Sequence, residues 1–101
     1  MKRYKVQLLP SAYKDLREAR SWYRQKNPNL PRQLNLHLKS AIEGINIAPY
    51  ANAIRYRDVR ICNLKVFPYA IHFCINENIN TVLIIAIHHT AMNPEIWEKK
   101  I

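Results

Sequence analysis

The sequence has few glycines and cysteines and no long apolar run, and each shortage excludes a class of protein. One glycine among 101 residues leaves no room for a glycine-rich phosphate-binding loop. The two cysteines, Cys62 and Cys74, lack the C-x-x-C spacing of redox and zinc sites and lie in apolar segments, so we expect reduced, buried thiols. The longest apolar run, residues 82–87, is far too short to cross a bilayer.

Acidic residues are also scarce, and this shortage points to an acidic partner. Sixteen Lys and Arg against seven Asp and Glu give a formal net charge of +9. Residues 1–50 hold ten basic and three acidic residues, so most of the surplus lies in the first half. Such a surplus favours encounter with acidic surfaces of proteins or nucleic acids, although a merely basic soluble domain has the same composition.

The length and the apolar content indicate one folded domain spanning residues 1–101. Hydrophobic residues make up 49% of the chain, which argues against disorder. The first residues do not resemble a signal peptide, so we expect a cytoplasmic protein that is not associated with a membrane. No motif calls for a cofactor, and none is expected.

The first half predicts a strand followed by a helical hairpin. Residues 4–9 alternate between apolar and polar side chains, which is typical of a strand with one exposed face. Pro10 ends it, and Ser11 is expected to cap a helix, with Asp15 favourably near the positive helix end. The apolar stripe of this helix is Ala12, Leu16, Ala19 and Tyr23.

A second helix is predicted to begin at Asn29 and to end at Pro49, with Pro31 tolerated in its first turn. The turn at residues 27–29 is short, so the two helices should pack as an antiparallel hairpin. The apolar stripe of the second helix is Leu34, Leu38, Ala41, Ile42 and Ile45.

The second half predicts a meander of strands. Runs of β-branched and aromatic residues between turn signals give strands over residues 54–57, 59–66, 69–75 and 81–88. The last of these is apolar on both faces, as expected of a central strand covered by helices. Residues 94–100 are compatible with a short terminal helix. Helices segregated to one side of a largely antiparallel sheet define an α+β fold.

The first predicted helix places a basic stripe beside its buried face. Guanidinium groups pair with carboxylates and phosphates and stack on rings, so this stripe suits a partner-binding surface. A solvated helix face would have the same pattern. The stripe consists of Tyr13, Arg17, Arg20 and Arg24.

The histidines give weak evidence for catalysis. Adjacent strand residues point to opposite faces, so His88 and His89 cannot both bind one metal without a bulge, and we expect no metal site. A single histidine at the end of a central strand would suit a general base, although a structural role is equally compatible. If the protein cleaved RNA, the phosphate-binding and acid–base candidates would be Arg60, Lys65, His72 and His89.

The order of short motifs resembles a known superfamily. Residues 60–97 read R-x-x-x-L-K-V-F-P-Y-A-I-H-F and then I-I-A-I-x-H-x-x-M-N-P-E-I-W, and residues 10–16 read P-S-A-Y-K-D-L. Together they resemble the RelE/ParE toxins of bacterial type II toxin–antitoxin modules, particularly the ParE-like plasmid-stabilisation group. The residues that carry the family motif are Phe67, Pro68, Tyr69, His89, Met92, Pro94 and Trp97.

This resemblance implies a helical hairpin packed on a curved, largely antiparallel sheet of four or five strands. It also implies a cognate antitoxin whose acidic C-terminal segment wraps the toxin and neutralises it, which suits a basic hairpin. ParE-like members inhibit DNA gyrase by binding, whereas RelE-like members cleave messenger RNA in the ribosome.

The chain departs from the sequence patterns of the superfamily at three places; two of them argue against a ribonuclease, and the third argues against full toxin activity. Ala70 stands where RelE-like sequences often have arginine, and residues 97–101 lack the basic or tyrosine-bearing tail of such nucleases. Met92 replaces the arginine of the usual H-x-x-R-x-P-x-x-W ending, which removes a charged, forked donor. We therefore expect a ParE-like gyrase inhibitor. The alternatives are a ribosome-dependent endoribonuclease and a non-toxic family member that binds only its antitoxin.

Overall fold

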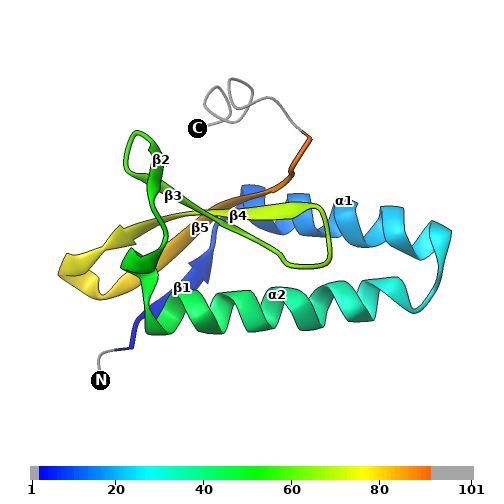
Figure 1. Ribbon diagram of the computed structural model, residues 1–101, viewed down its shortest axis with the longest axis horizontal. Helices are drawn as coiled ribbons and strands as arrows, with labels where there is room; N and C mark the ends of the chain where they lie inside the picture. The colour runs from blue at the N-terminus through cyan, green and yellow to red at the C-terminus, as the bar shows by residue number, and fades with distance from the viewer. Residues whose placement is uncertain (1–2, 92–101) are drawn as a thin grey trace.

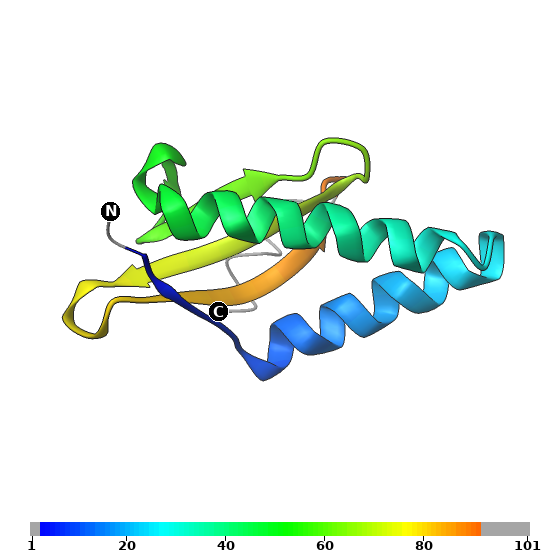
Figure 2. The same cartoon turned by 90° about the horizontal axis from the view of Figure 1, so that it is seen from below.

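The computed structural model describes residues 3–91 as one twisted sheet with two long helices on one face. The elements, in chain order, are β1 (Lys5–Leu8), α1 (Pro10–Lys26), α2 (Leu30–Ile47), η1 (Pro49–Ala51), β2 (Ile54–Tyr56), β3 (Val59–Asn63), β4 (Tyr69–Asn76), η2 (Glu77–Ile79) and β5 (Thr81–His89). Both helices lie across the same side of the sheet (Figure 1, Figure 2). The predicted α+β class and helical hairpin are confirmed.

The sheet has five strands in the order β1-β5-β4-β3-β2. The strands β2 to β5 form an antiparallel meander, and β1 adds to β5 in parallel. The predicted strand over residues 59–66 is shorter than expected, because β3 ends at Asn63 and a loop leads to β4. The last strand, β5, is central as predicted, but both described helices cover only one of its faces, contrary to our expectation.

The helical hairpin buries the stripes that the sequence predicts. Pro10 is the first residue of α1, and Pro31 lies in the first turn of α2, where a missing N–H costs no hydrogen bond. Phe73 and Ile71 of β4 are fully buried against the helices. The helix residues in this core include Ala12, Ala19, Leu34, Leu38 and Ile45.

The start of α1 differs from the prediction in a way that shapes the site. Leu9, not Ser11, is the N-cap, because the helix already begins at Pro10. The Ser11 hydroxyl instead donates to the Ile85 carbonyl of β5 at 2.6 Å. Asp15 also acts on β5, since its Oδ2 atom accepts from the Ile87 N–H at 3.0 Å. Two side chains of α1 therefore bond the edge of β5 beyond the point where β1 ends.

A β-bulge in β5 makes these bonds available. Ile84 pairs with Phe73 and Ala86 with His72, which leaves Ile85 as an extra residue in the strand. A bulge of this kind shifts which backbone groups face the strand edge. The backbone groups of Ile85 and Ile87 consequently face α1 rather than β4.

No helix within residues 3–91 is long and apolar enough to cross a membrane.

Candidate functional site

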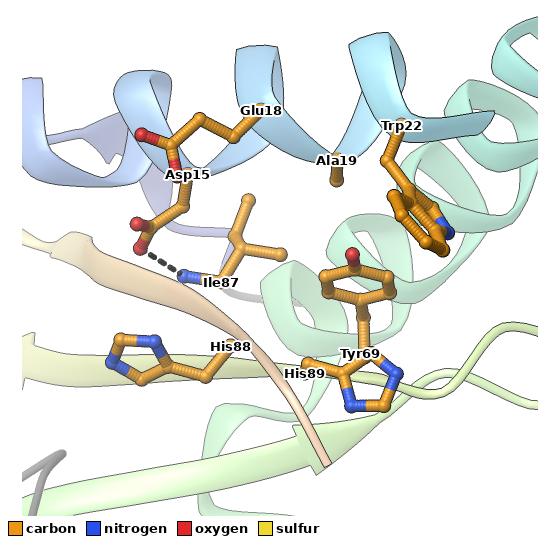
Figure 3. Close-up of a pocket in the computed structure, with 8 residues that line it drawn as sticks. All are labelled: Asp15, Glu18, Ala19, Trp22, Tyr69, Ile87, His88 and His89. Atoms are coloured by element: carbon orange, nitrogen blue, oxygen red, sulfur yellow. Dashed lines mark hydrogen bonds between the residues drawn. The ribbon is translucent and has the colours of Figure 1, made fainter. Parts of the chain in front are cut away.

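A pocket opens between α1 and the end of β5, and Figure 3 shows its lining. It has a volume of about 360 Å³. Asp15, Glu18 and Trp22 come from one side of α1, because residues three or four apart share a helix face. We call it the α1–β5 pocket; its lining is Asp15, Glu18, Ala19, Trp22, Tyr69, Ile87, His88 and His89.

The polar groups of the α1–β5 pocket differ in how firmly they are held. The Ile87 N–H fixes Asp15 at one carboxylate oxygen. Tyr69 is only 9% exposed, and its hydroxyl points into the pocket beneath α1 (Figure 3). Burial, with the nearby Tyr23 and Glu18, raises the pKa of Tyr69, so its hydroxyl stays protonated and able to donate. The exposed His89 ring packs edge-on against Tyr69, with centroids 5.3 Å apart.

The predicted basic stripe forms one surface on the outside of α1. Arg17, Arg20 and Arg24 line the same shallow hollow, together with Glu18 and Ser21. We call these three arginines the arginine face. Tyr13, which the sequence groups with them, is 52% exposed on the same helix, and so is the nearby Trp22, at 54%. Lys26 stacks on Trp22 with its Nζ 4.4 Å from a ring centroid.

The face of the sheet opposite the helices carries a buried histidine cluster that no sequence pattern predicted. The rings of His72 and His88 pack edge-on with centroids 4.9 Å apart. Tyr56 of β2 bonds His72 through its hydroxyl and the Nδ1 atom, at 2.9 Å. Burial, with His88 and Arg55 nearby, lowers the pKa of His72 from 6.5 to about 4, so its ring is neutral near pH 7.

The four nuclease candidates do not converge. Arg60 pairs with Phe73 across the sheet, and its side chain lies toward η1, where it donates to the Asn52 carbonyl at 2.6 Å and stacks on Tyr50. His72, the next residue along β4 from Phe73, points to the opposite face and is fully buried. Lys65 is exposed in the β3–β4 loop, at the same end of the sheet as His89, because Tyr69 at the start of β4 pairs with His89, but the two side chains line different pockets.

Comparison with known proteins places the chain in a family. Residues 6–94 match the model of the ParE toxin of the type II toxin–antitoxin system parDE. The chain belongs to the ParE toxin family. Comparison with curated protein sequences finds no match.

Solved structures share the fold of this ParE-family chain at low sequence identity. A chain of the chromosomal ParDE toxin–antitoxin system of P. aeruginosa has a TM-score of 0.74 at 14% identity, with 85% of this chain and 95% of that one covered. A chain of the RelBE2 complex of Mycobacterium tuberculosis has a TM-score of 0.59 at 21% identity, covering 86% and 98%. The isolated E. coli RelE toxin has a TM-score of 0.58 at 18% identity, covering 96% and 94%.

The family motif residues that the structure describes have packing roles in this ParE fold. The Phe67 ring packs edge-on against Tyr23 of α1, with centroids 5.1 Å apart, and also contacts His37 of α2. Pro68 accepts a hydrogen bond at its carbonyl from the Thr90 N–H, which closes the end of the β4–β5 ladder. Tyr69 and His89 line the α1–β5 pocket. Met92, Pro94, Trp97 and the predicted C-terminal helix lie outside the described residues.

Within residues 3–91, no three His, Cys, Asp or Glu side chains gather closely enough to hold a metal ion. Both cysteines are free and half-buried rather than fully buried, and burial raises the pKa of each thiol. The arginine face and the α1–β5 pocket are two features of the described surface that suit a partner, and they share Glu18 at their boundary.

Proposed function

We propose that this chain is a toxin that inhibits DNA gyrase by binding it, and that a cognate antitoxin neutralises it in the cytoplasm. The family match supports a ParE-type activity. Binding is favoured over RNA cleavage because Arg60 and His72 lie on opposite faces of the sheet and His72 is fully buried.

Cleavage of RNA needs a proton-transfer group and a phosphate-binding group within hydrogen-bond reach of one substrate. Arg60 already bonds a backbone carbonyl and stacks on Tyr50, which in turn donates to Glu77. His72 has no exposed surface, and its lowered pKa leaves it neutral near pH 7. In these positions Arg60 and His72 are suited to packing and hydrogen bonding within the fold rather than to acid–base chemistry.

The proposed antitoxin has an acidic C-terminal segment that docks on the arginine face. Three guanidinium groups on one helix side give carboxylates several forked donors, and their field also accelerates encounter. The exposed rings of Tyr13 and Trp22 beside these charges supply apolar contact area of the kind that interfaces favour. The module would then serve plasmid stabilisation or a chromosomal equivalent.

Expression in a bacterial host tests this proposal and separates it from its alternatives. We expect induction to stop growth, and we expect co-expression of the neighbouring reading frame to restore it. Primer extension on translated messages should reveal no new cleavage ends. New ends within codons would instead identify a ribosome-dependent ribonuclease, and unaffected growth with the complex still forming would identify a non-toxic binder.

A further inference from the structure

The α1–β5 pocket has a charge opposite to that of the rest of the protein. Two of the seven acidic residues in this chain, Asp15 and Glu18, line it, while no lysine or arginine does. The arginine face lies immediately beside it on the same helix. A partner segment that crosses both surfaces must therefore change the sign of its charge along its length.

The Glu18 carboxylate can bind a positively charged group of the partner segment. Within residues 3–91, no hydrogen bond or ion pair occupies its carboxylate, which is exposed at the rim of the pocket. Asp15 uses only Oδ2 for the Ile87 N–H, so its second oxygen retains accepting capacity. Two carboxylates three positions apart can share one forked cationic group.

The Tyr69 hydroxyl gives an independent sign that the pocket takes a polar ligand. Tyr69 is 91% buried, because only 9% of its surface is exposed, and its hydroxyl points into the pocket (Figure 3). No hydrogen bond within the described chain engages that hydroxyl. A hydroxyl that belongs to a largely buried side chain, opens into a pocket and has no hydrogen-bond partner among the described residues favours a ligand with complementary groups.

The walls of the pocket favour arginine over lysine. Tyr69 presents an aromatic surface on one side, opposite the carboxylates of Asp15 and Glu18, and beside it lies Trp22, whose ring already has the Lys26 ammonium stacked on it (Figure 3). A planar guanidinium stacks on such rings while its edge pairs with a carboxylate, whereas an ammonium group offers only a point charge.

We propose that the α1–β5 pocket binds a single arginine side chain of the antitoxin, at the end of the acidic segment that covers the arginine face. This inference rests on the proposed function, since it specifies how the same antitoxin is recognised. It also supplies specificity: a segment that places a carboxylate at the pocket meets Asp15 and Glu18 and is rejected by like charge.

Binding measurements between the purified toxin and antitoxin test the inference. Glu18→Gln keeps the size of the side chain and removes its charge, and we expect it to weaken binding about tenfold. Glu43→Gln is the matched control, because Glu43 is an exposed helix carboxylate that pairs with Arg3 outside the pocket. The melting temperatures of both variants should equal that of the wild type.

A charge-reversal rescue identifies the arginine itself. Glu18→Lys should bind the wild-type antitoxin poorly, and one Arg→Glu change in the antitoxin segment should restore binding to this variant alone. Replacing the same arginine by citrulline, a neutral isostere, should match the loss seen with Glu18→Gln and should not add to it. Tyr69→Phe should weaken binding without altering the preference for arginine.

The outcomes distinguish the two proposals. Equal affinity of the wild type, Glu18→Gln and Glu43→Gln would overturn the arginine pocket and leave the toxin assignment intact. Failure of every antitoxin arginine to rescue Glu18→Lys would overturn it as well. Absence of any complex with the wild-type toxin would contradict the proposed function, and with it the inference that depends on it.

Discussion

The Asp15 carboxylate of α1 accepts a hydrogen bond from the backbone N–H of Ile87 in β5, at 3.0 Å. Together with the bond from the Ser11 hydroxyl to the Ile85 carbonyl, it joins the helix to the edge of β5 beyond the end of β1. It holds α1 over the end of β5 and so sets the width of the α1–β5 pocket.

Asp15→Ala should therefore destabilise the fold. Ile87 is 2% exposed, so the variant leaves a buried N–H without its acceptor, at a cost of about 1–3 kcal/mol. Urea unfolding of the purified toxin measures the change. Asp15→Asn retains an acceptor oxygen and should lose less than the alanine variant; equal losses for both would contradict the account of this bond.

The family motif residue Phe67 should matter for stability more than for recognition. It is 6% exposed and packs edge-on against Tyr23 and His37, so it holds the β3–β4 loop against both helices. Phe67→Ala should cost about 3–5 kcal/mol. Chemical denaturation measures the loss. If antitoxin affinity fell while stability stayed unchanged, Phe67 would be a contact residue instead.

Stability should depend on pH through His72. Its folded-state pKa of about 4 is below the ordinary 6.5, so the unfolded chain binds more protons between these values. The neutral ring thus contributes stability above pH 6.5 that is lost as the pH falls toward 4, amounting to about 3 kcal/mol at most. Urea unfolding from pH 4.5 to 7.5 measures the slope, and His72→Gln should flatten it. An unchanged slope in that variant would assign the dependence to other groups.

The arginine face should govern the rate of antitoxin association. Replacing Arg17, Arg20 and Arg24 by glutamate should slow association at least about tenfold at low salt, and the difference should shrink as salt screens it. Stopped-flow mixing at several salt concentrations gives these rates. Arg32→Glu on the exposed side of α2 is the control. A similar slowing in this control would show a general charge effect rather than a docking surface.

The sequence predicted the fold well because its periodic patterns reflect burial directly. Alternation over residues 69–75 assigned Ile71 and Phe73 to one face, and both are fully buried under the helices. The helix stripes followed the same logic, with Leu34 and Leu38 in the core. These patterns are local, so one sequence is enough to read them.

The geometry of the candidate site could not be predicted in the same way, because it depends on contacts between elements that are distant in the sequence. Ser11 has the chemistry of a helix cap, but the helix begins one residue earlier, at Pro10, and the hydroxyl reaches β5 instead. The bulge at Ile85 that exposes the Ile87 N–H to Asp15 has no signal in an unbroken apolar run. Strand register likewise brought His72 beside His88 and Tyr56, whereas the sequence grouped it with Arg60.

Gyrase supercoiling in the presence of the purified toxin tests the central claim most directly. We expect the free toxin to inhibit supercoiling of relaxed plasmid in a concentration-dependent way, and we expect stoichiometric antitoxin to abolish the inhibition. Glu43→Gln should inhibit as the wild type does, because it lies outside the surfaces assigned to partners. Unimpaired supercoiling at a large excess of folded toxin would contradict the account.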